Sequence, residues 1–419
     1  MAHDVVVVGA GLAGLAAARE LVRHGRDVVV LEAGGMVGGR VRTDRVDGLL
    51  LDHGFQLHNP AYPEAMRVLD QAALDLKCFT PGVITLTDRG PSRLADPRRR
   101  PAWVPDALSA RTGSLPAKLR FARYAVETAL SSRTTRESRT DMPADVALLS
   151  AGVSPTLLET VVRPFLQGVF LESGLQTSRR FMDLVLTSFV RGVPAVPANG
   201  MQAIPEQLAS GLPAGTVRLG VRADSVSSGC VRTSEGELRA KAVIVATDPR
   251  TAADLMPGLA IPAGRDVTTW YFVADTPPML LTDGAPVLVV DGRSAPGPVI
   301  NTVVLTHAAP TYASRGRTLV SASALGLHDS SEMTALVRTT LAQLYGVDTR
   351  GWEAVGIYAI PYALPAMVPP LTIRQGVDLG DGLFIAGDHR DTASIQGALV
   401  SGRRAAGAVL AHVGVSTSA

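Results

Sequence analysis

The stretch Asp4-Val-Val-Val-Val-Gly-Ala-Gly-Leu-Ala-Gly14 decides the fold class. Its valine run predicts a buried strand of a parallel sheet, and Leu12–Arg23 predicts a helix that stops at Gly25. A second apolar run, Asp27–Leu31, predicts the next strand. Two strands and a helix within about thirty residues form a βαβ unit, which begins a Rossmann-like α/β domain.

The glycine pattern Gly9-x-Gly11-x-x-Gly14 predicts a binding loop for the pyrophosphate of a dinucleotide. In such a loop the first glycine allows a tight turn, and the second lets the backbone approach the phosphates. The third lets the helix pack closely on the strand, and the helix N-terminus presents free N–H groups to negative charge. The residues expected to contact the dinucleotide here are Gly9, Gly11, Leu12, Ala13 and Gly14.

An acidic residue at the end of the second strand narrows the choice of dinucleotide. Glu32 follows the apolar run, and Ala33 comes next. A carboxylate at this place accepts hydrogen bonds from ribose hydroxyls, whereas it repels a 2′-phosphate. The sequence therefore disfavours NADP, and we expect Glu32 and Ala33 to belong to the cofactor site.

Composition excludes several classes of protein. Hydrophobic residues make up 46% of the 419 residues and charged residues 19%, which is typical of a globular chain. The net charge of +2 gives no reason to expect a nucleic-acid partner. The two cysteines, Cys78 and Cys230, lie outside any metal-binding pattern, so we expect neither a disulfide framework nor a metal site.

Apolar runs and charge predict where in the cell the protein is found. No uncharged apolar run reaches about 18 residues, and a strand beginning at Asp4 leaves no room for a signal peptide, so we expect a cytoplasmic protein. The charge is uneven, however, because residues 89–139 carry twelve Arg and Lys against four Asp and Glu. This segment forms either a solvated face or a peripheral contact with an anionic membrane.

The segment Glu32-Ala-Gly-Gly-Met-Val-Gly38-Gly39-Arg40 resembles a flavin-binding motif. The motif belongs to the flavin amine oxidase superfamily, which includes amine oxidases, protoporphyrinogen oxidase and the phytoene, carotene and squalene desaturases. The resemblance implies that FAD is the cofactor. It also implies that Gly38 and Gly39 lie over the pyrophosphate and that Arg40 lies near the phosphate charge.

A stretch near the C-terminus, Leu383–Arg403, resembles the second flavin motif of the same superfamily. It implies a buried strand followed by a helix whose N–H groups face the flavin N1/C2=O edge, where negative charge collects on reduction. No cysteine lies in this motif, so we expect the FAD to be bound non-covalently. The residues implied to contact FAD are Gly387, Asp388, Ser394, Ile395, Gln396 and, in a strand over 217–226 beside the adenine, Ala223.

The segment Asp52-His53-Gly54-Phe55-Gln56 looks like the flavin-proximal segment of the plant-type phytoene and squalene desaturase branch. That likeness implies that Gly54, Phe55 and Gln56 lie beside the flavin. Amine oxidases carry a tyrosine of an aromatic cage where Ser394 stands, and they usually carry a lysine near flavin N5, whereas no lysine occurs between Pro262 and Ala419. For His53, as for His58, we expect a hydrogen-bonded structural role.

The resemblance therefore implies an FAD-dependent enzyme that removes hydride from a C–H bond of a lipophilic, polyene or isoprenoid-like substrate. The sequence names no catalytic base. Amine or protoporphyrinogen oxidation is the enzymatic alternative, and a prenyl-protein-binding relative without redox chemistry is the non-enzymatic one. We expect residues 1–75, 198–261 and 362–419 to form the FAD-binding domain. Residues 76–197 and 262–361 would form a discontinuous α+β substrate domain.

Overall fold

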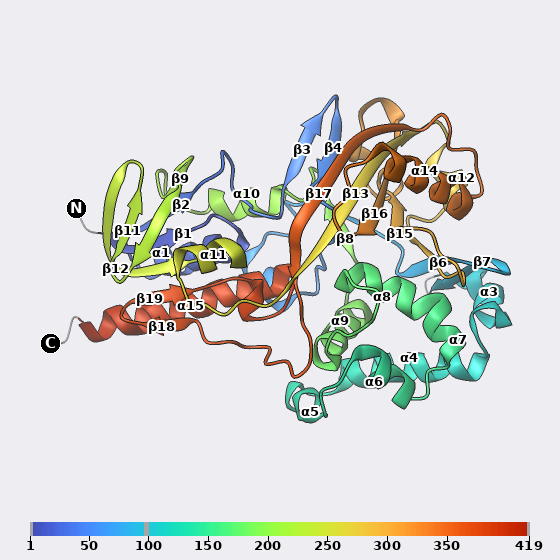
Figure 1. Cartoon of the computed structure of the whole chain (residues 1–419), viewed down its shortest axis with the longest axis horizontal. Coiled ribbons are helices and arrows are strands. Elements are labelled where there is room, and N and C mark those ends of the chain that lie inside the picture. Colours follow the sequence, from blue (N-terminus) through green and yellow to red (C-terminus); the bar gives the residue numbers. More distant parts are fainter. Residues whose placement is uncertain (1–2, 96–99, 417–419) are drawn as a thin grey trace.

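A parallel sheet forms the core of one half of the molecule, in the region that carries both termini (Figure 1). In the computed structural model, which describes residues 3–95 and 100–416, β1 pairs in parallel with β2 and with β12. β9 extends the sheet beyond β2, and β19 extends it beyond β12. These strands are β1 (His3–Val8), β2 (Val28–Glu32), β9 (Val217–Leu219), β12 (Gly236–Val245) and β19 (Leu383–Ile385).

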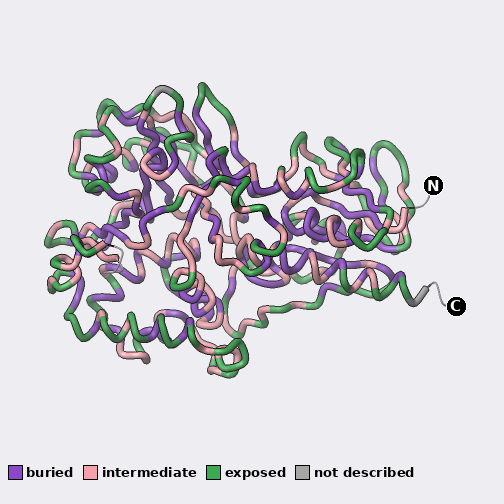
Figure 2. Tube along the Cα trace, turned by 180° about the vertical axis from the view of Figure 1, so that it is seen from behind, coloured by how far each residue is buried: buried purple, intermediate pink, exposed green. Residues whose placement is uncertain are grey.

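Alternate side chains of β1 face two different cores, which explains its unbroken valine run. Val5 and Val7 pack with helices α1 (Leu12–Arg23) and α15 (Ile395–Ser416) on one face of the sheet. Val6 and Val8 pack on the other face with Leu255 of helix α11 (Pro249–Leu255). The central strands β1 and β2 are buried over Val5–Val8 and Val28–Leu31, and Figure 2 shows buried chain in the interior of this half of the molecule. The predicted doubly covered parallel sheet is therefore confirmed.

One predicted strand is wrong. The sequence indicates a single strand over 217–226, but the chain turns at Gly220, whose φ is 74°. β9 therefore ends at Leu219, and β10 (Ala223–Ser227) begins a separate antiparallel hairpin with β11 (Cys230–Thr233) and β12. Glycine adopts a positive φ without strain, and this turn divides a segment in which apolar and polar residues alternate on both sides of Gly220.

A second, seven-stranded sheet forms the upper part of the other half of the molecule (Figure 1). Its strands are antiparallel neighbours except for the parallel pair β14 and β6. Trp270 and Phe272 of β13 are fully buried against helix α14 (Ser331–Tyr345). In sheet order the strands are β17 (Glu353–Pro365), β13 (Gly264–Ala274), β16 (Thr318–Leu325), β15 (Val299–Val304), β14 (Leu288–Asp291), β6 (Gly82–Thr87) and β7 (Gly90–Ala95).

A group of helices lies below this sheet in Figure 1. Most of them contribute to a core that contains Leu148, Leu166 and Met182. Among residues 3–95 and 100–416, no helix combines the length and the apolar character needed to cross a bilayer. The helices are α3 (Val104–Leu108), α4 (Leu115–Leu130), α5 (Arg133–Ser138), α6 (Ala144–Ser150), α7 (Pro155–Leu157), α8 (Arg163–Phe170) and α9 (Arg179–Arg191).

The remaining elements connect these parts. The hairpin of β3 and β4 projects from the top of the molecule in Figure 1, and β5 pairs with β8. The boundaries between the two predicted domains stay a prediction. The connecting elements are β3 (Thr43–Val46), β4 (Leu49–Asp52), α2 (Pro63–Val68), β5 (Leu76–Cys78), β8 (Ala195–Pro197), α10 (Ala203–Ser210), α12 (Pro278–Leu281), α13 (Leu305–Ala308) and β18 (Asp378–Gly380).

Candidate cofactor site

The three glycines of the first loop have three different environments. Gly9 has a φ of 105°, which is the tight turn expected of it. A Cβ on Gly14 would lie 2.0 Å from the carbonyl oxygen of Gly9, so α1 packs on β1 as closely as predicted. A Cβ on Gly11 would meet no atom within 4 Å. Gly11 therefore leaves open space in front of the backbone, as a loop that receives a phosphate requires.

The N-terminus of α1 is available to a ligand. Gly11 is its N-cap residue, and no side chain caps the helix there. The first N–H groups of the helix, from Leu12, Ala13 and Gly14, have no intrahelical acceptors, and the positive end of the helix dipole lies beside them. Such an end binds the negative charge of a pyrophosphate without any basic side chain.

The second glycine-rich loop lies directly against the first. The N–H of Gly38 donates to the carbonyl of Ala10 over 2.8 Å, and Gly38 forms a bridge with Gly11. A Cβ on Gly39 would lie 3.4 Å from the Cα of Gly11, and the φ of Gly39 is 60°. The structure thus brings together the two loops that the sequence places at the pyrophosphate.

Glu32 holds the turn between these loops. One carboxylate oxygen accepts from the N–H of Ala10 over 2.8 Å, and the other accepts from the N–H of Gly34 over 2.8 Å. Ala33, between them, is exposed. The carbonyl of Glu32 accepts from the N–H of Val221 over 2.9 Å, two residues before the half-buried Ala223. Val221 is a neighbour of this site that the sequence does not indicate, because its pattern predicts an unbroken strand over 217–226.

Arg40 joins the N-terminal and C-terminal motifs. Its guanidinium donates to the carboxylate of Asp388 over 2.6 Å and to the carbonyl of Ala363 over 2.9 Å. Burial alone would lower the pKa of Arg40, but the charge of Asp388 beside it raises that pKa above its usual range. Asp388 follows Gly387, whose N–H donates to the hydroxyl of Ser401 over 2.9 Å. The pair lies between two segments that are both predicted to contact FAD.

Ser394 caps the C-terminal helix. Its hydroxyl accepts from the N–H of Gly397 over 3.0 Å, and its carbonyl accepts from the N–H of Ala398. Ser is a preferred N-cap residue because its oxygen satisfies one of the free N–H groups of a first helical turn. Among the described residues, the backbone N–H groups of Ile395 and Gln396 have no acceptor outside the helix, so this turn can still receive a ligand oxygen.

Two predicted flavin contacts use their side chains to hold the protein together. The side-chain oxygen of Gln396 accepts from the N–H of Glu64, at the start of α2, over 3.0 Å. The carboxylate of Glu64 in turn accepts from Arg403 of α15 over 2.9 and 3.0 Å. The amide of Gln56 donates to the carbonyls of Arg40 over 2.7 Å and His53 over 3.0 Å. Both glutamines therefore position the loops that surround the site.

The segment that contains Gly54 and Phe55 reaches the second sheet. Gly54 has a φ of 89°, and a Cβ there would lie 2.9 Å from the side chain of Ile360 on β17. The ring of Phe55 meets that of Phe79 edge to face, with centroids 6.2 Å apart. This segment thus lies where the two halves of the molecule meet.

The histidines near the motifs differ from each other. His53 pairs with Asp44 over 3.0 Å, as expected of a structural residue. For His58 the same expectation is wrong, because both its ring nitrogens are buried and lack a partner among the described residues. His389, directly after Asp388, is also buried, and both its ring nitrogens lack a partner among the described residues. Burial lowers the pKa of His58 and that of His389 to about 4.

Asp52 is a buried acid behind the site. Its carboxylate accepts from the hydroxyl of Thr43 over 2.5 Å, the N–H of Met201 over 3.0 Å and the hydroxyl of Tyr312 over 2.9 Å. Its carbonyl accepts from Tyr271 of β13 over 2.7 Å. Burial raises the pKa of Asp52 to about 6, and the hydrogen bonds only partly offset it. Asp52 thus ties the β3–β4 hairpin to the second sheet.

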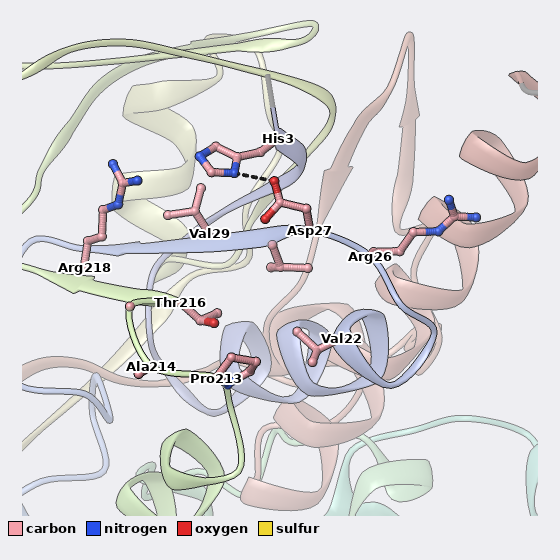
Figure 3. Close-up of a pocket in the computed structure, with 11 residues that line it drawn as sticks. His3, Val22, Arg26, Asp27, Val29, Pro213, Ala214, Thr216 and Arg218 are labelled. Atoms are coloured by element: carbon pink, nitrogen blue, oxygen red, sulfur yellow. Dashed lines mark hydrogen bonds and ion pairs between the residues drawn. The ribbon is translucent and has the colours of Figure 1, made fainter. Parts of the chain in front are cut away.

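Two other features lie outside this site. A shallow cavity of about 260 Å³ opens at the amino ends of β1, β2 and β9, where His3 pairs with Asp27 over 2.8 Å (Figure 3). In open α/β sheets cofactors bind at the carboxyl ends of the strands, so this cavity is separate. In residues 3–95 and 100–416, no group of three or more His, Cys, Asp and Glu side chains could hold a metal ion.

The residues of the site fit a dinucleotide that carries a flavin. An uncapped helix N-terminus, open space at Gly11 and two adjoining glycine loops suit a pyrophosphate. The carboxylate of Glu32 has capacity for further hydrogen bonds, since each oxygen accepts one in the structure. Residues 12–410 match the family model for flavin containing amine oxidoreductase.

The chain belongs to the flavin-containing amine oxidoreductase family. It is an FAD-dependent oxidoreductase, and the predicted superfamily and cofactor are confirmed. Its assignment to the plant-type desaturase branch of that superfamily stays a prediction.

Individual relatives resemble the chain over short segments. Putrescine oxidase of Kocuria rosea is 51% identical over 73 residues, which are 17% of this chain and 15% of that protein. Protoporphyrinogen oxidase 2 of Arabidopsis thaliana is 46% identical over 70 residues, 17% of this chain and 14% of that protein. The matches thus cover less than a fifth of these relatives' length, so the fold evidence comes from whole structures.

Solved structures resemble the chain along nearly its whole length. Wild-type putrescine oxidase bound to putrescine has a TM-score of 0.68 and 18% identity, over 98% of this chain and 99% of that one. Cyclohexylamine oxidase from Brevibacterium oxydans IH-35A has a TM-score of 0.68 and 17% identity, over 99% and 100% of the two chains. At such identity the likeness establishes the fold, and the α/β prediction is confirmed.

Proposed function

We propose that the protein removes a hydride from a C–H bond of a lipophilic, polyene or isoprenoid-like substrate. Bound FAD supplies the hydride acceptor, at flavin N5. The chain itself supplies binding, orientation and a fixed electrostatic environment. Positioning alone contributes about 7–11 kcal/mol to a step of this kind, so the reaction does not require a side-chain base.

The observation that carries this proposal is the role of Ser394. Its hydroxyl is used as the N-cap of α15, and a serine has no ring with which to hold an amine against the flavin. The three lysines of the chain are also placed elsewhere. Lys77 pairs with Asp75 over 2.9 Å, Lys241 pairs with Asp4 over 2.7 Å, and Lys118 lies on α4.

In this proposal, two helix N-termini and one ion pair stabilise the negative charges of the bound cofactor. The N-terminus of α1 and the guanidinium of Arg40 would hold the pyrophosphate charge. The N–H groups of Ile395 and Gln396 would hold the flavin N1/C2=O edge, where negative charge collects on reduction. Asp388 holds the guanidinium of Arg40 in place.

Oxidation of a porphyrinogen or an amine is the alternative. A protoporphyrinogen oxidase of Arabidopsis thaliana is among the relatives, and its name implies a porphyrinogen substrate. Putrescine oxidase is another relative, whose name implies an amine substrate. Because Ser394 caps α15 and has no aromatic ring, it favours porphyrinogen oxidation over amine oxidation.

A lipophilic substrate has a natural source in a membrane. We therefore propose a cytoplasmic protein that contacts a bilayer peripherally through residues 89–139, where twelve basic residues outnumber four acidic ones. The same charge gives no reason to propose a nucleic-acid partner, because the net charge of the whole chain is only +2.

Anaerobic flavin bleaching tests the substrate class. The FAD-loaded protein is mixed with lipophilic polyenes, protoporphyrinogen, and mono- and polyamines, and the loss of flavin absorbance is followed. We expect polyenes to reduce the flavin rapidly and amines to reduce it slowly. Rapid, saturable reduction by an amine at micromolar concentration would overturn the proposal. Preferential reduction by protoporphyrinogen would select the first alternative.

A further inference from the structure

Helix α4 carries apolar side chains on the face that it turns to solvent. Leu115 is 43% exposed, Leu119 60%, Val126 47% and Leu130 80%. Their spacing of four, seven and four residues places them on one side of an α-helix, and the exposed Ala122 lies among them. We name these four residues (Leu115, Leu119, Val126 and Leu130) the α4 stripe.

The opposite face of α4 is already anchored in the protein. Tyr124, Ala125 and Thr128 are buried, and α4 packs along α9. The hydroxyl of Tyr124 donates to the buried carboxylate of Asp183 on α9 over 2.7 Å. The α4 stripe therefore cannot turn inwards without breaking this contact, and its apolar area is left for something outside the chain.

Basic side chains lie beside the stripe. Lys118 donates to the carbonyls of Ala107 over 2.8 Å and Ser109 over 2.7 Å, which places the 56% exposed Leu108 of α3 at the same end of α4. Arg111 and Arg120 are exposed as well. In the part of the chain that the structure describes, none of these three cations has a carboxylate within ion-pair distance.

We propose that α4 is a membrane-docking helix, and that its partner is a bilayer surface containing anionic lipid. The inference rests on the peripheral membrane contact of the proposed function and names the element that makes it. An apolar stripe with cations beside it suits an interface where acyl chains lie below negative headgroups. The leucines enter the apolar layer while the exposed Arg111 and Arg120 stay at the phosphates. A protein partner would need acidic groups around an apolar groove.

Co-sedimentation with vesicles tests the helix and the lipid class. The full-length, FAD-loaded protein is mixed with vesicles of phosphatidylcholine alone, or of phosphatidylcholine and phosphatidylglycerol. We expect binding to the anionic vesicles that weakens as salt is added. The double variant Leu119→Ser/Leu130→Ser should lower the bound fraction at least about tenfold, because two exposed leucines no longer enter the apolar layer.

Two further variants complete the test. Arg111→Gln/Arg120→Gln should remove the preference for anionic vesicles and leave weak binding to both. Leu336→Ser is the matched control, because Leu336 is 50% exposed on α14, far from α4, and it should bind like the wild type. Thermal melting and flavin content, unchanged in all variants, show that each still folds.

Each contrary result has its own meaning. Equal binding to both vesicle types by the wild type overturns the anionic partner. Undiminished binding by Leu119→Ser/Leu130→Ser overturns α4 as the docking element. A dimer of the wild type that this double variant dissociates would assign the stripe to a second copy of the chain. Flavin bleaching without vesicles is a separate measurement, so the substrate proposal can fail while the docking proposal stands, and the reverse.

Discussion

Arg40 and Asp388 are separated by 348 residues in the sequence, and the guanidinium of the first donates to the carboxylate of the second over 2.6 Å. The side chain of Asp388 is 5% exposed and that of Arg40 is 31% exposed. The pair is thus shielded from water on one side and open on the other. It connects the glycine loop after β2 to the loop after β19, so both loops depend on it for their relative position.

Asp388→Asn should weaken this connection. A hydrogen bond to a charged group is worth about 1.5–3 kcal/mol, so we expect the free energy of unfolding to fall by that amount and FAD to bind at least tenfold more weakly. Chemical denaturation and fluorescence titration of the apoprotein with FAD measure the two effects. Arg350→Gln is the control, because the pair of Arg350 with Asp348 is exposed at 90% and 59%. Equal FAD affinity in Asp388→Asn and wild type would contradict the role given to the pair.

The glycine loop offers two substitutions with opposite outcomes. Gly14→Ala places a methyl group 2.0 Å from a backbone oxygen, so we expect insoluble or unfolded protein. Gly11→Ala places its methyl group in open space at an ordinary φ of −71°, so the fold should survive while FAD affinity falls. Melting temperature and flavin content after purification distinguish the two. Gly407→Ala, also in open space but in the middle of α15, should retain flavin. Full flavin content in Gly11→Ala would show that the pyrophosphate does not lie there.

Glu32→Gln tests whether its carboxylate has both a structural role and a ligand role. The variant keeps one oxygen for Ala10 or Gly34 but turns an –NH₂ group toward the other N–H, which leaves that donor unpaired. We expect FAD affinity to fall at least tenfold, from loss of a charge-assisted bond of about 1.5–3 kcal/mol. Isothermal titration with FAD measures it, and the exposed Glu235→Gln serves as control. A fall in melting temperature without any change in FAD affinity would limit Glu32 to the structural role.

Asp52 should make stability depend on pH in the weakly acidic range. Its pKa is about 6 in the folded protein against 3.8 for an ordinary aspartate, so the folded state holds the proton more tightly than the unfolded state does. The stabilising contribution of this group is fully present below about pH 4 and is lost as the pH rises through about 6, with a total change of about 3 kcal/mol.

Asp52→Asn removes that titration while keeping an oxygen for Thr43 and Met201. Its amide can donate to Tyr312, whose hydroxyl can also accept. Denaturation curves at pH 4, 5, 6 and 7 should converge with those of the wild type at the acid end, and the variant should be the more stable at the neutral end. Parallel curves for the two proteins would mean that folding does not raise the pKa of Asp52.

The sequence pattern predicts those elements that depend on residues close together in the chain. The valine run of β1, the helix from Leu12 to Arg23 and the strand of β2 follow from periodicity and glycine spacing, and the structure has them within a residue or two. The pattern does not predict the division at Gly220, because apolar and polar residues alternate on both sides of this glycine as they would in one continuous strand.

Long-range pairing could not be read in the same way. β6 and β7 join the sheet that contains β13–β17 because β6 pairs with β14, which lies far from it in the sequence. No local pattern indicates that these two strands pair. Gln56 and Gln396 are predicted to lie beside the flavin, but the sequence does not indicate where their side chains point. Their hydrogen bonds to Arg40 and Glu64 show that partners outside the motif determine where a motif residue points.

The pairing of β1 with β12 has a consequence for how the protein is made. During synthesis β1, α1 and β2 leave the ribosome together, but the register of the central strand, Val5 opposite Ala242, cannot form until more than two hundred residues later. The ion pair of Arg40 forms later still, because Asp388 must be synthesised first. Until then the C-terminal flavin motif does not face the glycine loops. We therefore expect FAD to bind in the final stage of folding. A ribosome-stalled chain that ends before β19 should therefore emerge colourless, even where its first domain strands have already paired.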